Sequence, residues 1–160
     1  MHHVSGRTAR NKPFRKGNAA PTRLDNCRVP RDRAAMFMTL LSVALGGAIG
    51  ASLRFGVGLW AARMFATSFP LGVMSVNVIG SFLMGAFAIW SVERGYTGLN
   101  PFVMTGILGG FTTFSAFSLE ALTLIERGQA ASALLYVGLS VGLSIGALAL
   151  GFWLMRGALA

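Results

Sequence analysis

The sequence is poor in charge for its length. Only 12% of its 160 residues are charged, whereas 54% are hydrophobic. In a soluble domain about a quarter of the residues are charged, so this composition excludes an ordinary soluble protein. It also excludes intrinsic disorder for most of the chain, because disordered segments combine few apolar residues with much charge.

Residues that build common catalytic and metal sites are scarce as well. The single cysteine is Cys27, and the only histidines are His2 and His3. Neither an intrachain disulfide nor a cysteine-based metal site is therefore expected. The sequence has no Ser/His/Asp set and no glycine-rich phosphate loop, and its only carboxylates in one segment are Glu120 and Glu126. We do not expect an enzyme.

The charge that is present is unevenly distributed. Of the formal net charge of +9, residues 1–35 carry +7 and residues 36–160 only +2. We interpret residues 1–35 as a basic disordered tail on an apolar body. The tail could touch anionic lipid, could bind nucleic acid, which a basic run alone supports weakly, or could be absent if translation starts at Met36 or Met38. We favour the late start or a dispensable arm, and expect no nucleic-acid partner.

The few charges of the body divide it into four long apolar intervals. Between successive charged residues lie runs of 20, 29, 25 and 28 uncharged residues. A helix needs roughly 20 apolar residues to cross a bilayer. We therefore predict an all-α membrane protein with four transmembrane helices, at about 36–57, 70–92, 102–125 and 131–155.

The arginines of the body specify almost no orientation. With the N-terminus inside, the cytoplasmic ends hold Arg94 and Arg156, and the outer ends hold Arg63 and Arg127, with Arg54 at the end of the first span. Lys and Arg near span ends normally decide which side stays in the cytoplasm. Because the two sides hold nearly equal numbers of arginines, the body is expected to insert in both orientations and to pair antiparallel with itself.

Small residues recur at helical spacing inside the spans and predict close helix packing. Asn77 is the other conspicuous residue there, because its amide must find hydrogen-bond partners in lipid. An interhelical hydrogen bond and a polar pathway are both open interpretations of it. The small-residue steps are Gly46/Gly50, Gly106/Gly110 and Gly138/Gly142/Gly146, the last interleaved with Ser140 and Ser144.

The third span contains residues that favour a break in the middle of the membrane. Gly109 and Gly110 are poor helix formers, and Thr112 and Thr113 carry hydroxyls that compete for backbone groups. Irregular backbone at that depth must be buried or line a cavity, and its freed carbonyls are hard oxygen ligands for a small cation. Phenylalanines and serines follow at close spacing, namely Phe111, Phe114, Ser115, Phe117 and Ser118.

Three motifs of the body resemble the CrcB/Fluc family of fluoride channels. The resemblance covers residues 36–160 and all four spans in order, and the third motif is the most specific. The motifs are Gly46-Gly-Ala-Ile-Gly50-Ala-Ser-Leu-Arg54-Phe, Val76-Asn77-Val-Ile-Gly80-Ser81-Phe, and Gly109-Gly110-Phe-Thr112-Thr113-Phe114-Ser115-Ala116-Phe117-Ser118-Leu-Glu120.

This resemblance implies an antiparallel, dual-topology homodimer with two fluoride pores in the bacterial inner membrane. It places a structural sodium ion on the two-fold axis, held by the backbone carbonyls of Gly109 and Thr112 from both subunits. It also places pore phenylalanines at Phe114 and Phe117, the pore asparagine at Asn77 and the end-of-span arginine at Arg54. One departure is Ala116, where the family often has threonine.

The chemistry of these residues agrees with passive fluoride export. Fluoride is strongly hydrated, so a pore must replace its water with donors, and Asn77, Ser115 and Ser118 offer them. Aromatic rings present a positive edge, so Phe114 and Phe117 can face an anion without a charge that would trap it.

Two other classes of membrane protein remain as alternatives. A small multidrug-resistance transporter is also four-spanning and dimeric, but it relies on an acid in the first span, and this span has none. A non-transporting assembly factor would explain the glycines but not the third motif. Fluoride efflux from liposomes would separate the three.

A protein that begins at Met36 is expected to insert in both orientations and to form a conducting dimer, because the arginines of the body nearly tie. A topology reporter fused after Ala160 should therefore give signal on both sides of the membrane. Signal on one side alone would contradict dual topology. Loss of the dimer or of fluoride flux would show that the tail is needed.

Overall fold

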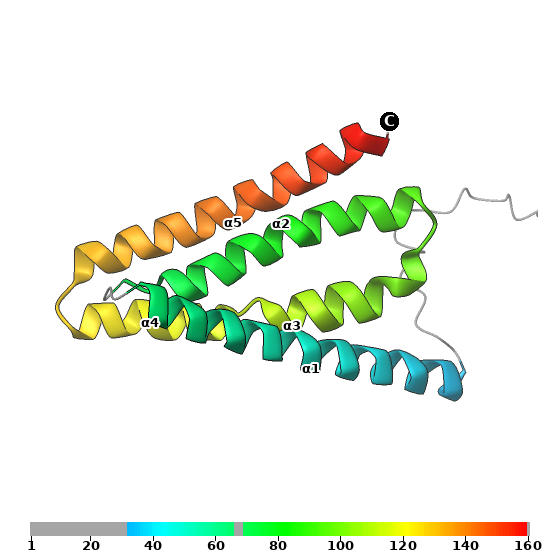
Figure 1. The fold of residues 1–160 in the computed structure, drawn as a ribbon, viewed down its shortest axis with the longest axis horizontal. Coiled ribbons are helices and arrows are strands. Elements are labelled where there is room, and N and C mark those ends of the chain that lie inside the picture. Colours follow the sequence, from blue (N-terminus) through cyan, green and yellow to red (C-terminus); the bar gives the residue numbers. More distant parts are fainter. Residues whose placement is uncertain (1–31, 66–68, 160) are drawn as a thin grey trace, which may run out of the picture. The chain divides into compact units, whose positions relative to one another are not determined.

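The computed structural model describes residues 32–65 and 69–159, all of which belong to the unit Arg31–Ala160. The predictions for the tail, as far as they concern residues 1–31, lie outside the described residues. Helices and the turns between them make up this part of the chain, and it contains no strand (Figure 1).

The chain folds as an antiparallel helical bundle whose third member is interrupted. Four stretches are long and apolar enough to cross a membrane, namely Arg33–Met64, Leu71–Glu93, Thr97–Glu126 and Ala130–Leu159. The prediction of four such helices with a broken third is confirmed. The elements are α1 (Arg33–Met64), α2 (Leu71–Glu93), the 3-10 turn η2 (Thr97–Leu99), the π-helix η3 (Pro101–Leu108), α3 (Gly109–Phe111), α4 (Phe114–Glu126) and α5 (Ala130–Leu159).

The first helix is longer than the expected span 36–57. It begins earlier, at Arg33, and ends later, at Met64. Its 32 residues give a length of about 48 Å at the usual rise, more than the ~30 Å of a bilayer core. The expected bounds followed membrane thickness, whereas the helix continues because residues 59–64 are good helix formers.

Two glycines end helices in the left-handed conformation. Gly95 has φ 73° and Gly128 has φ 76°, values that only glycine adopts without strain. After α2, the amide of Tyr96 donates to the carbonyl of Ser91 (2.8 Å). After α4, the amide of Gln129 donates to the carbonyl of Leu124 in the same way (2.9 Å). This pairing satisfies terminal carbonyls and lets each helix reverse within a short turn.

Glycines bring the helices into backbone contact in two places. α2 and α5 lie side by side along most of their length (Figure 1), and a Cβ at Gly85 or Gly151 would collide with a carbonyl oxygen of the opposite helix. On the other side of the bundle, α1 contacts η3 and α3. There Gly46 and Gly106 face each other, and Gly110 lies against the backbone of Gly47. The predicted packing role of the first two glycine steps is thus a contact within the chain.

The glycine row of the fourth span behaves differently. A Cβ at Gly138, Gly142 or Gly146 would meet no heavy atom within 4 Å in the part of the chain that the structure describes. This row therefore makes no close contact within one chain, and its predicted packing role stays a prediction for a second chain.

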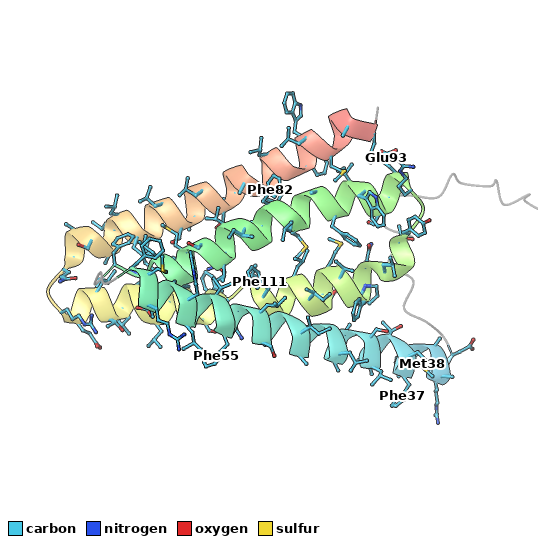
Figure 2. All side chains as sticks on the ribbon, in the orientation of Figure 1. Phe37, Met38, Phe55, Phe82, Glu93 and Phe111 are labelled. Atoms are coloured by element: carbon cyan, nitrogen blue, oxygen red, sulfur yellow. The ribbon has the colours of Figure 1, made fainter. Side chains whose placement is uncertain are left out.

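The outer surface of the bundle is apolar. Large hydrophobic side chains project from α1 away from the other helices, among them Phe37, Met38 and Phe55 (Figure 2). Phe55 is 68% exposed and Phe37 63%. A soluble protein rarely exposes so continuous an apolar surface, so these side chains are placed to meet lipid or another protein.

Replacing Gly85 with alanine should destabilise the bundle, because the new methyl group would meet the carbonyl of Leu148 across the α2–α5 contact. Overpacking of this kind costs roughly 1–3 kcal/mol. Unfolding of the purified protein in detergent would measure it. The matched control is Gly142→Ala on α5, where open space surrounds the glycine. Equal stability of the two variants would contradict the contact.

Candidate functional site

The interruption of the third span lies at two threonines. Thr112 (φ −78°, ψ 155°) and Thr113 (φ −152°, ψ 117°) are extended, whereas Gly109 is still helical (φ −65°, ψ −36°). The break that was predicted around Gly109–Thr112 therefore starts at the end of that segment. Gly110 instead allows the third span to approach α1 closely, because its backbone packs against that of Gly47.

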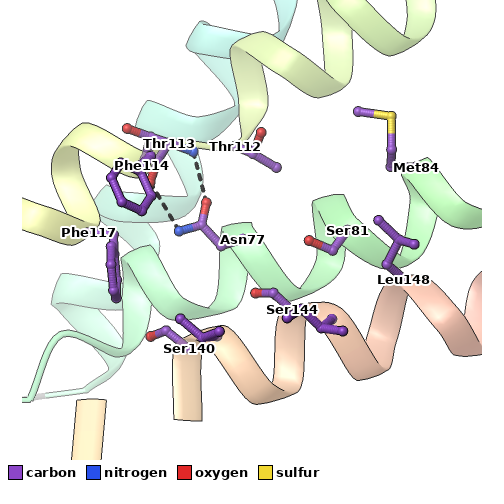
Figure 3. Close-up of a pocket in the computed structure, with 12 residues that line it drawn as sticks. Asn77, Ser81, Met84, Thr112, Thr113, Phe114, Phe117, Ser140, Ser144 and Leu148 are labelled. Carbon is purple, nitrogen blue, oxygen red and sulfur yellow. Dashed lines mark hydrogen bonds between the residues drawn. The ribbon is translucent and has the colours of Figure 1, made fainter. Parts of the chain in front are cut away.

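The side chain of Asn77 on α2 replaces the missing backbone partners of Thr113. The amide N–H of Thr113 donates to Asn77 Oδ1 (2.8 Å), and Asn77 Nδ2 donates to the carbonyl of Thr113 (3.1 Å) (Figure 3). One side chain thus satisfies both backbone groups of an extended residue. Of the two interpretations left open for Asn77, the interhelical hydrogen bond is present in the structure.

Thr113 also starts the next helix. Its Oγ1 accepts from the amide of Ala116 (3.2 Å) and lies 3.2 Å from Ser115 Oγ. A threonine oxygen that accepts from the third residue of a helix is an N-cap. Thr112 therefore ends α3, and Thr113 begins α4.

The break removes the usual donors from two carbonyl oxygens. In a continuous helix the amide of Thr113 would bond to the carbonyl of Gly109, but it donates to Asn77. The amide of Ala116 would likewise serve the carbonyl of Thr112, but it donates to Thr113 Oγ1. These are the two carbonyls that the family resemblance implies as cation ligands, and the geometry leaves both without those donors.

A pocket of about 380 Å³ lies beside the break (Figure 3). It brings together residues of α2, the break, α4 and α5. Its walls are uncharged and mostly apolar, with a few hydroxyl and amide groups. The lining residues are Asn77, Ser81, Met84, Thr112, Thr113, Phe114, Phe117, Ser140, Val141, Ser144, Ile145 and Leu148.

The hydroxyls that α5 offers to this pocket are not used within the chain. The oxygens of Ser140 and Ser144 are buried and have no hydrogen-bond partner among the described residues, and the same holds for Tyr136 one turn earlier. Serines on helices commonly donate to the carbonyl four residues back, as Ser52 does here (2.8 Å). Ser140 and Ser144, which line the pocket, can therefore donate to a ligand, and Tyr136 lies close enough to Ser140 to interact with it.

Sequence reasoning missed this row of hydroxyls. The sequence pattern assigns Ser140 and Ser144, with the neighbouring glycines, to helix packing and gives Tyr136 no role. The signal was present, because Tyr136, Ser140 and Ser144 recur every four residues and so share one helix face. What the sequence could not show is that this face turns toward Asn77 and the break.

The two predicted phenylalanines have different surroundings. Phe117 is 9% exposed and packs with Leu124, Ala133 and Tyr136. Its ring centroid lies 5.4 Å from that of Tyr136 and 5.4 Å from that of Phe114. Phe114 is 78% exposed although it lines the same pocket. One ring is thus part of the core, and the other forms an open wall.

The remaining predicted residues lie apart from this pocket. Ser115 and Ser118 are exposed and do not line it, and Ser118 Oγ donates to the carbonyl of Phe114 (2.9 Å). Arg54 lines a second pocket of about 280 Å³, which also contains Thr113 and Ala116. The structure thus joins Asn77, Phe114 and Phe117, but not the two serines or the arginine.

Side-chain ligands for a metal ion are not grouped in this part of the molecule. Among residues 32–65 and 69–159, no three His, Cys, Asp or Glu side chains come together. A cation at the break would therefore be held by backbone oxygens.

A family and several named relatives match most of this chain. The family described as CrcB-like protein, Camphor Resistance (CrcB), matches residues 41–152, which include the second and third spans and most of the first and fourth. The chain belongs to the CrcB family. With its four apolar helices, this CrcB protein is a multi-pass membrane protein.

Several relatives of this CrcB protein carry the name fluoride-specific ion channel FluC. The relative from Ruegeria sp. (strain TM1040) is 61% identical over 125 residues, which is 78% of this chain and 99% of the relative. The relative from Roseobacter denitrificans is 57% identical over 121 residues, 74% of this chain and 96% of the relative. The relative from Jannaschia sp. (strain CCS1) is 62% identical over 93 residues, 58% of this chain and 89% of the relative.

Thr113→Val should destabilise the protein by about 1 kcal/mol, because it removes the N-cap of α4 while keeping the branched shape. Unfolding in detergent would measure the loss, and Thr113→Ser should restore it. The control is Thr123→Val, which removes only a hydroxyl that donates to the carbonyl of Leu119 on an exposed helix face. If both valine variants lose the same stability, Thr113 has no capping role.

Proposed function

We propose that this protein is a fluoride-selective ion channel that passively exports cytoplasmic fluoride across the bacterial inner membrane and so lowers its toxicity. The relatives support this proposal, because the Ruegeria protein named as a fluoride channel aligns over 99% of its length at 61% identity. The pocket supports it independently. The observation that carries it is the set of unpartnered hydroxyls on α5, which face the pocket beside the break.

The chemistry of the pocket suits a small, strongly hydrated anion. Ser140 and Ser144 can donate to it in place of water, and the pocket lining contains no charged side chain. A buried Lys or Arg would hold the anion too long, whereas conduction requires binding that is easily reversed. Uncharged donors therefore favour passage over storage.

Phe114 and Phe117 fit the same purpose. Aromatic rings are positive at their edges, so a ring that turns its edge to the pocket stabilises an anion weakly. The two rings are tilted by 42° to each other with their centroids 5.4 Å apart, so they are not stacked face to face. Both rings line the same pocket as the hydroxyls of Ser140 and Ser144.

Export needs no energy source beyond the membrane potential. HF crosses membranes as a neutral molecule and dissociates in the cytoplasm. An inside-negative potential of 100 mV then favours exit of the anion by about 2.3 kcal/mol per charge. Arg54, in its separate pocket, would concentrate anions near one mouth of the pathway.

The active form in this proposal is an antiparallel, dual-topology homodimer. Phe114 lines the pocket yet is 78% exposed, so one wall of the pathway is open in a single chain. The row Gly138, Gly142 and Gly146 is also uncovered, although such rows normally bring helices together in lipid. A second copy in the opposite orientation would cover both.

A sodium ion would join the two breaks. The carbonyls of Gly109 and Thr112 fit this role, because each has lost its helical donor. Two chains would supply four neutral oxygens, a set that suits a monovalent cation better than a divalent one. When bound, the ion would supply positive charge and hold the two broken segments together.

Liposomes that contain only this protein would test the function. Fluoride efflux should follow the potential set by a potassium gradient and valinomycin, and chloride efflux should be much slower. Efflux of neither anion, or proton-coupled uptake of a cationic drug instead, would favour the transporter alternative over the channel.

Phe114→Ile should abolish fluoride flux with little change in the stability of the single chain, since the side chain is exposed there and loses only its ring edge. Phe117→Ile should abolish flux too, and should also lose roughly 1–3 kcal/mol, because it is packed in the core. Flux would be measured on protein shown to be dimeric, and stability by unfolding in detergent. Full flux in both variants would show that the two rings serve only packing.

A further inference from the structure

Asn77 forms a direct connection between the pocket and the freed carbonyls. Its side chain lines the pocket, and its Oδ1 accepts the amide proton of Thr113. That amide is the group that a regular helix would give to the carbonyl of Gly109. Holding the amide at Asn77 and leaving the carbonyl of Gly109 free are therefore two results of one hydrogen bond.

The alternative bonding is close at hand. Gly109 and Leu108 are already helical, and the amide of Thr112 still donates to the carbonyl of Leu108 (3.0 Å). Only the next amide in the series leaves the helix. Without an acceptor on α2, the amide of Thr113 would have no polar partner at that depth, and an unpaired group in lipid is costly. Bonding to Gly109, which extends α3 by one residue, is the nearest remedy.

We infer that Asn77 is a positioning residue that keeps the carbonyl of Gly109 available to a cation and thereby couples the cation site to the anion pocket. This inference rests on the proposed function for the identity of the cation and the anion. It assigns the two ends of the Asn77 amide different tasks. Oδ1 controls the carbonyl of Gly109, whereas Nδ2 fixes the carbonyl of Thr113 and so the start of α4.

The pocket can still use Asn77 while it holds the break. Nδ2 has two protons, and one is committed to the carbonyl of Thr113. The second remains for a ligand in the pocket. Any anion that binds this proton acts on the same amide that holds the break, so occupancy of the pocket and cation binding are linked through one side chain.

Three variants separate these tasks. Asn77→Leu removes both hydrogen bonds at similar volume. Asn77→Asp keeps an oxygen that accepts from Thr113, in either protonation state, and should block flux because an ionised carboxylate repels the anion. Ser81→Ala is the matched control, since Ser81 lies one turn further along α2 and lines the same pocket, but no hydrogen bond joins it to the break in the described part of the chain.

The measurement is thermal stability of the purified dimer at increasing Na⁺, with N-methylglucamine as the replacement cation. The wild type and Ser81→Ala should be stabilised by Na⁺ with the same midpoint. Asn77→Asp should keep that response although it conducts no fluoride. Asn77→Leu should need at least tenfold more Na⁺, or should not respond.

Each other outcome counts against the inference. An unchanged Na⁺ midpoint in Asn77→Leu would show that the carbonyl of Gly109 does not depend on Asn77. Loss of the response in Asn77→Asp would place the control elsewhere than at the accepted proton. If the wild type itself ignores Na⁺, the coupling is wrong together with the sodium site. Fluoride efflux from wild-type liposomes is measured separately, so the channel function can stand or fail by itself. Should Asn77→Leu not fold, the aspartate variant and the wild type still decide.

Discussion

The structure depends on the rule that backbone polar groups in a membrane must find partners inside the protein. Three of the four membrane-length segments obey it as continuous helices. The third obeys it with a break, because Asn77 supplies to Thr113 both an acceptor and a donor. These two hydrogen bonds allow an extended residue at a depth where its unpaired backbone groups would otherwise be too costly. The pocket, the restart of α4 and the freed carbonyls all follow from them.

Helix packing places the Asn77 side chain where these hydrogen bonds are possible. In lipid there is no hydrophobic drive between helices, so close approach depends on small residues. Gly80 on α2 faces Thr112 and Phe111, and a Cβ there would strike the side chain of Thr112. The small residue Gly80 thus lets α2 come close enough to the break for Asn77 to reach Thr113. The contact and the hydrogen bonds support each other.

Sequence reasoning could find the elements of this arrangement but not their pairing. Charge spacing alone predicts four helices, because bilayer thickness imposes a length that the sequence must match. The glycines and threonines of the third span predict a break as well. Its position at Thr112 and Thr113 was beyond the sequence, since Gly109 and Gly110 have the lower helix propensity, and tertiary contact with α1 decides otherwise. The same limit applies to Ser140 and Ser144, whose spacing is visible but whose direction depends on how α5 rotates against α2.

The two sides of the pocket differ in how they are packed. On one side Phe117 packs in the core with Tyr136, close to the unpaired hydroxyls of Ser140 and Ser144. On the other side the ring of Phe114 is 78% exposed. The oxygens of Ser140 and Ser144 are buried without a hydrogen-bond partner among the described residues, and an unpaired buried hydroxyl costs about 1–3 kcal/mol. A small polar ligand that accepts from them in the pocket would remove that cost. The unpaired hydroxyls on one side and the exposed ring on the other are the two features that the proposed dimer and its ligand would satisfy.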